Sequence, residues 1–106
     1  MTKKVFLEVL IPTFDRPSSA MRAMQSVVIA NDPRVGGRCQ SNKPEPKLEE
    51  FSATCDAIVY DQFSTNLGPH KSSYKLLDDT DATFCMLLSD EDRISSERLE
   101  AFLDYL

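Results

Sequence analysis

Three short apolar segments, each followed by residues with a helical repeat, constrain the fold of this chain most strongly. Residues 5–11, 57–60 and 82–88 are too short for typical helices and are rich in strand-forming residues. A nearly unbroken apolar run of this length is typical of a strand that is buried on both faces, as in a parallel sheet. The alternation of strands and helices therefore predicts an α/β fold with right-handed crossovers.

The first strand and helix are separated by a short polar loop. Pro12 cannot donate to a sheet ladder, so the first strand is expected to end there. Apolar residues recur at helical spacing from Pro17 to Ala30, which predicts a helix over this range. Asp15 suits the N-cap of that helix, and Pro17 suits its first turn, where a missing N–H needs no partner.

Two further helices are expected in the second half of the chain. The first begins at Pro69, turns Tyr74 and Leu77 inward, and ends in the acidic cluster at 78–81. The second is capped by Ser95 or Ser96. Its inward positions are expected to be Leu99, Phe102, Leu103 and Leu106.

The segment between the first helix and the second apolar run has a different character. It contains three prolines, two glycines and many charged residues, but few apolar ones. The sequence therefore predicts a long polar loop at about 31–52, with a short helical turn near 48–51. A loop of this length in a small domain is either functional or mobile.

Composition bounds the class of protein. The 106 residues suffice for one small domain, and the net charge of -5 argues against nucleic acid and anionic membrane surfaces as partners. No apolar run approaches the ~18 residues of a membrane helix, and no signal peptide is visible. The chain has an odd number of cysteines, widely spaced at Cys39, Cys55 and Cys85. The single histidine, His70, does not stand at a spacing from them that is typical of a zinc site. These cysteines are interpreted as reduced thiols of a cytoplasmic protein.

An acidic motif, Asp90-Glu91-Asp92, follows the last apolar run directly. Open α/β sheets place their ligand chemistry at the carboxyl ends of strands. Two carboxylates one residue apart can hold a hard cation, which in turn can bridge the phosphates of a nucleotide. The other interpretation is a solvated acidic turn before a helix, because 17 of the 106 residues are acidic.

Two segments together resemble a known family. Residues 10–17, LIPTFDRP, resemble the opening "IPTYNRP" signature of family 2 glycosyltransferases of the GT-A fold. Residues 66–69 and 88–92, NLGP and LSDED, resemble that family's "N-x-G-P … LxDDD" segment in order and spacing. The resemblance covers about 5–30 and 57–106. It implies a shortened, GT-A-like (Rossmann-like), mostly parallel sheet with flanking helices, forming a single domain over 1–106 that binds a nucleotide-diphosphate sugar.

The resemblance implies roles for the first loop. Pro12, Thr13 and Phe14 would line the uracil of a UDP-sugar, with Thr13 hydrogen-bonded to it and Phe14 giving an apolar face. Asp15 and Arg16 would fix the loop, and Arg16 would reach a phosphate. The same residues also suit strand termination and helix capping, and the two interpretations are compatible.

The resemblance also implies a cation site for Mn²⁺ or Mg²⁺ at the acidic motif. Asp92 is the first candidate for direct metal contact, and Asp90 would bind the ribose or the metal. Glu91 would either point elsewhere or support the site by contacting the groups that bind the cation. The cation would neutralise charge on the departing diphosphate.

A second strand signature is ambiguous. Residues 58–65 resemble the family's "VVDDGST", in which the first Asp binds uracil, and this implies that role for Asp61. The other interpretation of Asp61 is a strand-end acid in water. The chain shows one strand where the family has two. Either Asp61 binds uracil and a later strand is missing, or the second strand is absent and the long loop replaces it.

The helix after this strand contributes further candidates. Asn66 and Gly68 belong to the N-x-G-P segment and are expected at the nucleotide. A basic residue on that helix often touches the diphosphate in the family, which implies Lys71 or Lys75 for this contact. Lone lysines on a helix are usually only solvated.

The catalytic base is unassigned, because in the family the acceptor-binding half lies further along and is absent here. The expected function is therefore a donor-binding domain that binds a UDP-sugar through a divalent cation, for transfer to an unknown acceptor. The alternatives are a non-catalytic nucleotide-binding or regulatory module, and a small α/β domain whose acidic turn is only surface. An exposed sheet edge in so short a fold predicts a homo-oligomer.

Overall fold

The computed structural model describes residues 5–62 and 68–106. Strands and helices alternate along the chain. They are β1 (Leu7–Thr13), α1 (Pro17–Ala30), β2 (Val35–Ser41), α2 (Pro46–Ala53), β3 (Ile58–Gln62), α3 (Gly68–Asp79), β4 (Phe84–Leu87) and α4 (Ser96–Tyr105). Over the described residues the sheet has the order β3-β2-β1-β4, and each neighbouring pair is parallel. This confirms the predicted α/β fold with a parallel sheet and flanking helices.

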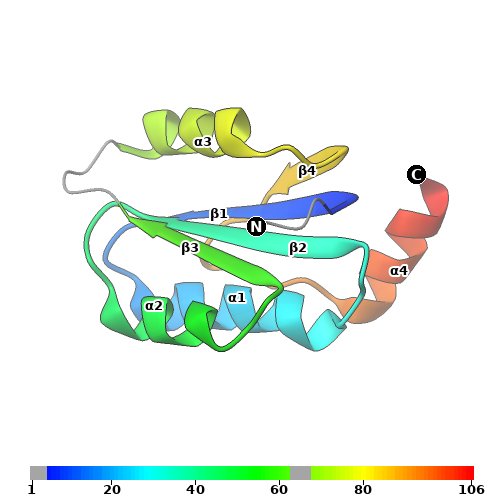
Figure 1. The fold of residues 1–106 in the computed structure, drawn as a ribbon, viewed down its shortest axis with the longest axis horizontal. Coiled ribbons are helices and arrows are strands. Elements are labelled where there is room, and N and C mark those ends of the chain that lie inside the picture. Colours follow the sequence, from blue (N-terminus) through cyan, green and yellow to red (C-terminus); the bar gives the residue numbers. More distant parts are fainter. Residues whose placement is uncertain (1–4, 63–67) are drawn as a thin grey trace.

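The helices cover both faces of the sheet (Figure 1). The ribbon shows α1 and α2 along one face and α3 along the opposite face, with α4 beside the end of α1. Successive residues of a strand point to opposite faces, so one set of β1 side chains faces α1 and the other faces α3. The buried cluster between the sheet, α1, α2 and α4 includes Leu7, Val9, Ile11, Ala20, Ala23, Met24, Val27, Leu48, Ile58, Leu99 and Leu103.

The first strand extends beyond its predicted end. β1 runs to Thr13 and pairs with β2 as far as Thr13 opposite Ser41, whereas its pairing with β4 stops at Leu10. The carbonyl of Leu10 accepts a hydrogen bond from the backbone N–H of Leu88, so the backbone groups of Leu10 point toward the β4 side of β1. Backbone groups alternate in direction along a strand, so those of Pro12, two residues on, point to the same side. The missing N–H of Pro12 therefore lies on the side where β1 no longer has a partner strand, and the expected end at Pro12 is wrong.

Helix α1 has the predicted bounds, and Pro17 begins it as expected. The predicted N-cap is wrong, because Arg16 occupies that position and no side chain caps the helix. Asp15 instead adopts a positive φ of 55° in the tight turn before it. Asp is one of the few residues that adopt this conformation at modest cost.

The predicted loop at about 31–52 is wrong, because it contains β2 and α2, but the helical turn expected near 48–51 is confirmed as part of α2. β2 is central despite its polar sequence. A Cβ at Gly37 would lie 2.5 Å from Ile58 Cδ1, so glycine there allows close packing of the neighbouring strand. The guanidinium of Arg38 forms ion pairs with Glu8 at 3.3 Å and Asp61 at 3.0 Å, and these compensate its positive charge within the sheet. α2 contributes one fully buried side chain, Leu48, to the core.

Helix α3 ends in the acidic cluster as predicted, but its inward residues are different. Leu76 is fully buried, whereas Tyr74 and Leu77 are 66% and 41% exposed, so their predicted inward positions are wrong. The difference is a rotation of the helix about its axis, because residues 74, 76 and 77 lie on different parts of its surface.

In α4 the cap and half of the inward positions are confirmed. Ser95 accepts a hydrogen bond from the Arg98 backbone at 3.4 Å, and Leu99 and Leu103 are buried. Phe102 and Leu106 are each 43% exposed, so their predicted inward positions are wrong. The helix buries a narrower stripe than the sequence pattern indicates.

β4 forms one edge of the described sheet and is shorter than predicted. Phe84 and Leu87 are both more than 40% exposed, although the sequence of the strand is wholly apolar. This agrees with the expected exposed edge, while the homo-oligomer inferred from it stays a prediction.

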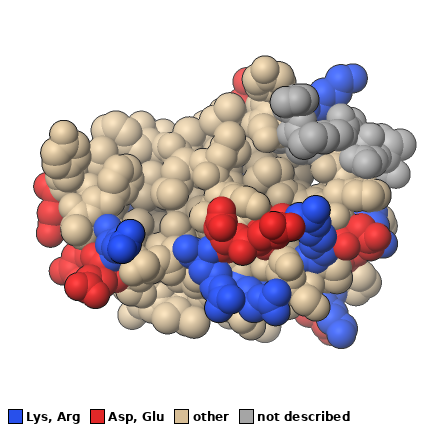
Figure 2. Space-filling model, turned by 180° about the vertical axis from the view of Figure 1, so that it is seen from behind, with Lys and Arg blue, Asp and Glu red and all other residues tan. Residues whose placement is uncertain are grey.

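Charged residues of both signs are interspersed on the surface. Figure 2 shows Lys and Arg side chains lying among Asp and Glu in a band across the face that it draws. Within residues 5–62 and 68–106, no helix combines the length and the apolar character needed to cross a membrane.

Candidate functional site

The carboxyl ends of β1, β2 and β4 meet at one edge of the sheet. Thr13 at the end of β1 is in register with Ser41 at the end of β2, and the backbone of Asn42 donates to the carbonyl of Thr13 at 3.1 Å. On the other side of β1, the backbone of Leu88 donates to Leu10 at 2.8 Å as the chain leaves β4. This places the first loop beside the acidic motif, at the edge where parallel sheets carry their ligand sites.

A buried hydrogen bond joins these two segments. The Thr13 hydroxyl donates to Asp90 Oδ2 at 2.7 Å, between residues 77 positions apart in the sequence. Thr13 is 5% exposed and Asp90 is 7% exposed. A buried carboxylate needs such partners, because burying an unpaired charge is costly. The structure thus brings together two of the predicted site residues and gives Asp90 a fixed position.

Arg16 completes this cluster from the start of α1. Its guanidinium Nη1 lies 3.5 Å from Asp90 Oδ1 and also forms an ion pair with Glu91. The Arg16 and Glu91 side chains are 53% and 62% exposed, in contrast to 10% for the Asp90 side chain. The acidic motif therefore has one buried carboxylate held by two partners and one exposed carboxylate held by Arg16.

The rest of the first loop lies at the surface. Phe14 is 46% exposed, which leaves its ring available to a ligand. The Asp15 carboxylate accepts a hydrogen bond from Lys43 Nζ at 2.7 Å, and this contact raises the pKa of Lys43. Lys43 follows β2 and joins the site from a segment in which the sequence indicated only a loop, so no sequence signal pointed to it.

Asp61 lies elsewhere on the sheet. It is on β3, in register with Gln40 of β2, which is in register with Pro12 of β1. It is therefore two strands away from β1, and its carboxylate is paired with Arg38. Burial opposes the charge of Arg38, but Glu8 and Asp61 together raise its pKa.

Both explanations offered for the single strand near Asp61 assumed that a strand is absent, and that assumption is wrong. Neither strand is missing, because β2 lies within the segment predicted as a loop. β2, which lies beside β1, ends at Ser41 and is followed by Asn42. The sequence pattern did not point to either of these polar residues as part of the site. Gln40, also in β2, is 1% exposed, and its side-chain amide oxygen Oε1 has no hydrogen-bond partner in the part of the chain that the structure describes.

Asp92 is, with Glu91, one of two exposed carboxylates of the acidic motif. Its backbone donates to Ser89 at 3.0 Å, which closes a turn and directs the chain toward α4. Across the described residues, no group of three or more His, Cys, Asp or Glu side chains is arranged to hold a metal ion. Mg²⁺ usually binds through one or two carboxylates together with substrate phosphates and water. Asp92 fits that mode of binding. The described residues do not fit a cation site made by protein ligands alone.

The remaining candidates lie on or before α3. Gly68 is its first residue, and Lys71 is exposed in its first turn. Lys75 pairs with Asp79 at 2.9 Å along the helix. Asn66 lies outside the described residues.

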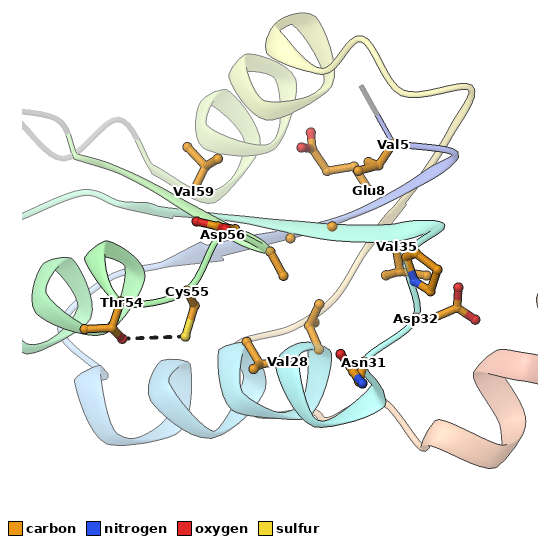
Figure 3. A pocket seen from close by; sticks show the side chains of 15 residues that line it. Val5, Glu8, Val28, Asn31, Asp32, Val35, Thr54, Cys55, Asp56 and Val59 are labelled. Carbon is orange, nitrogen blue, oxygen red and sulfur yellow. Dashed lines mark hydrogen bonds between the residues drawn. The ribbon is translucent and has the colours of Figure 1, made fainter. Parts of the chain in front are cut away.

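A cavity of about 630 Å³ lies at the opposite end of β2, away from these residues (Figure 3). Its lining includes Val5, Val28, Asn31, Thr54 and Cys55, which surround the start of β2. None of the predicted site residues lines it. Because ligand sites of parallel sheets lie at the carboxyl ends of the strands, the Thr13–Asp90 cluster, and not this cavity, is the candidate site.

Comparison with known proteins shows likeness in structure. No family model matches the chain, and neither does any curated protein. Among solved structures, residues 1–349 of S. aureus TarS match with a TM-score of 0.82 and 17% identity, over 97% of this chain and 32% of that one. A second structure of S. aureus TarS matches with a TM-score of 0.74 and 18% identity, over 97% of this chain and 20% of that one.

The fold is glycosyltransferase-like. At these identities the match to TarS shows the Rossmann-like GT-A fold and does not extend to activity. The chain spans about a third of the first matched structure and a fifth of the second. Membership of family 2 stays a prediction.

Proposed function

We propose that this chain is the donor-binding domain of a glycosyltransferase, which binds a UDP-sugar through Mn²⁺ or Mg²⁺ for transfer to an acceptor that is not identified. The observation that carries the proposal is the buried hydrogen bond between Thr13 and Asp90. It joins the two segments that resemble the family at the carboxyl edge of a glycosyltransferase-like fold.

The first loop supplies the binding surface for the base. Pro12 and Phe14 offer apolar surface, and the exposed ring of Phe14 is suited to packing against a planar base. Thr13 has a second use for its hydroxyl oxygen, which can accept a hydrogen bond while its proton is donated to Asp90. The helix dipole of α1 adds a weak positive potential at the start of the helix. No acidic residue in the first turn and no side-chain cap offsets this potential.

The acidic motif supplies the cation contact. Asp92 would hold the cation together with the diphosphate, and Asp90 would contact the ribose or the same cation. Bound there, the cation would neutralise charge on the departing diphosphate. Lys71 remains a proposed contact to the diphosphate from α3. Asp61 is left out of the proposed site, because its carboxylate is paired with Arg38 two strands away from β1.

A second candidate is a non-catalytic nucleotide-binding module with the same fold. The contacts of Asp90 favour this candidate. Both oxygens of the Asp90 carboxylate already contact protein donors, so Asp92 is the carboxylate left to hold the cation that the transfer reaction would need. Binding of UDP without sugar transfer would support this candidate.

Isothermal titration calorimetry of UDP, with and without Mn²⁺, tests the proposal. We expect Mn²⁺ to strengthen UDP binding, and Asp92→Ala to weaken binding in Mn²⁺ by about tenfold or more, because a directly bound carboxylate is lost. Asp81→Ala, which removes an exposed aspartate before β4, is the matched control and should bind like the native protein. No binding by the native protein under either condition would contradict both candidates and leave the acidic motif as a surface turn.

A further inference from the structure

We propose that Arg16 is an anion-binding residue whose guanidinium is paired with Glu91 while no ligand is bound. When a nucleoside diphosphate binds, a ligand phosphate replaces the Glu91 carboxylate at Arg16. This inference rests on the proposed function. It gives Glu91 the role of a positioning residue and Arg16 the direct phosphate contact.

The two carboxylates that contact Arg16 differ in how firmly they are held. Asp90 is buried and is also bonded to Thr13, so it stays in place when a ligand binds. Glu91 is mostly exposed, and Arg16 is its ion-pair partner among the described residues. The Glu91 contact is therefore the one that a ligand can displace without opening the core.

The chemistry of the guanidinium supports this exchange. A guanidinium binds phosphate oxygens with the same paired geometry that it uses for carboxylates, so the positive charge stays compensated when one anion replaces the other. An exposed ion pair is weak, and its loss costs little. Arg16 also stands directly before the uncapped start of α1, where the helix dipole favours an anion.

The exchange and a role in which Glu91 supports the cation predict opposite changes in UDP affinity when Glu91 is removed. If Glu91 competes with the phosphate for Arg16, its removal strengthens UDP binding. If Glu91 stabilises a bound cation by its charge, its removal weakens UDP binding in the presence of the cation. Uridine lacks phosphate, so the exchange leaves uridine binding unchanged, whereas a structural role of Glu91 alters the binding of uridine and UDP together.

The test is a double-mutant cycle of UDP and uridine affinity, measured by calorimetry with Mg²⁺ and with a chelator. The proteins are the native chain, Arg16→Gln, Glu91→Gln and the double variant. We expect Glu91→Gln to bind UDP about two- to fivefold more tightly, which corresponds to the strength of an exposed ion pair. Arg16→Gln should weaken UDP binding about tenfold or more through loss of a charged hydrogen bond. Glu91→Gln should have no effect when Arg16 is already Gln, because the competition is then gone.

Several outcomes would overturn the exchange. These are an unchanged or weaker UDP affinity in Glu91→Gln, an equal change for uridine and UDP, or a gain from Glu91→Gln that persists in the Arg16→Gln background and so reflects net charge alone. In these cases the native protein still binds UDP and the proposed function stands. If the native protein and all variants fail to bind UDP, the proposed function is overturned and the exchange with it.

Discussion

The hydrogen bond between Thr13 and Asp90 gives a direct prediction about stability. Thr13→Val keeps the shape of the side chain but removes the donor that lies 2.7 Å from Asp90 Oδ2. A hydrogen bond to a charged group contributes about 1.5–3 kcal/mol, and the extra buried methyl group offsets up to about 0.8 kcal/mol of its loss. We therefore expect the free energy of unfolding to fall by about 1–2 kcal/mol, or the Tm by roughly 5–10 °C for a domain of this size.

Urea unfolding followed by circular dichroism measures this change, and an unchanged m-value would show that the unfolded state is not altered. Thr54→Val is the matched control, because the Thr54 hydroxyl is exposed and bonds the backbone of its own helix at 2.8 Å. It should change stability by less than about 0.5 kcal/mol. In an Asp90→Ala background, Thr13→Val should cost little, because its partner is already absent.

The reasoning is refuted if Thr13→Val unfolds within about 0.5 kcal/mol of the native protein, which is the range of an ordinary surface substitution. The same holds if Thr13→Val costs as much in the Asp90→Ala background as in the native chain. Either result would mean that the first loop and the acidic motif lie together without a stabilising bond.

Three further predictions concern the core and the sheet edge. Burial, reinforced by nearby carboxylates, raises the pKa of the Cys39 thiol from 9.0 to about 12, so the unfolded thiol ionises first and stability should fall as the pH rises from about 9 toward 12. Urea titrations at pH 8 and pH 10 should show this loss, and a Cys39→Ala variant with an equal alkaline loss would contradict it. Leu76→Ala should destabilise the protein by about 2–5 kcal/mol and Leu77→Ala by less than about 1 kcal/mol, because the first side chain is fully buried and the second is 41% exposed. Thermal unfolding compares the two variants. A larger loss of stability for Leu77→Ala than for Leu76→Ala would instead support the inward position predicted for Leu77. The exposed edge at β4 should give a dimer that forms with rising concentration and that Leu87→Lys weakens. Sedimentation velocity tests this, and a native monomer at the highest concentration would exclude it.

The sequence was most informative where a helix or strand follows a simple apolar period. The bounds of α1 were predicted correctly, because its apolar spacing and Pro17 point to the same helix. The parallel sheet was predicted from the apolar runs of its strands, and the proximity of Thr13 to Asp90 follows from that topology.

The sequence was least informative where tertiary contacts replace apolar side chains. β2 is a central strand with two glycines and an arginine, because close packing at Gly37 and ion pairs at Arg38 take the place of large apolar residues. Without β2, Asp61 seemed to end the strand beside β1. Ser41, which ends β2, and Asn42, which follows it, went unrecognised. The inward face of α3 was misjudged for a related reason, since one buried leucine decides the rotation of a short, largely exposed helix.

The most direct test of the proposed site is a titration of ¹⁵N-labelled protein with UDP and Mg²⁺, followed by backbone amide NMR shifts. If the carboxyl edge of the sheet binds the nucleotide, the largest shifts should come from 13–16, 41–43 and 89–92, where the first loop, the end of β2 and the acidic motif meet. Residues around the cavity at the other end of β2, such as Gly36, Thr54 and Cys55, should shift little. Shifts centred on that cavity, or no shifts at all, would contradict the account.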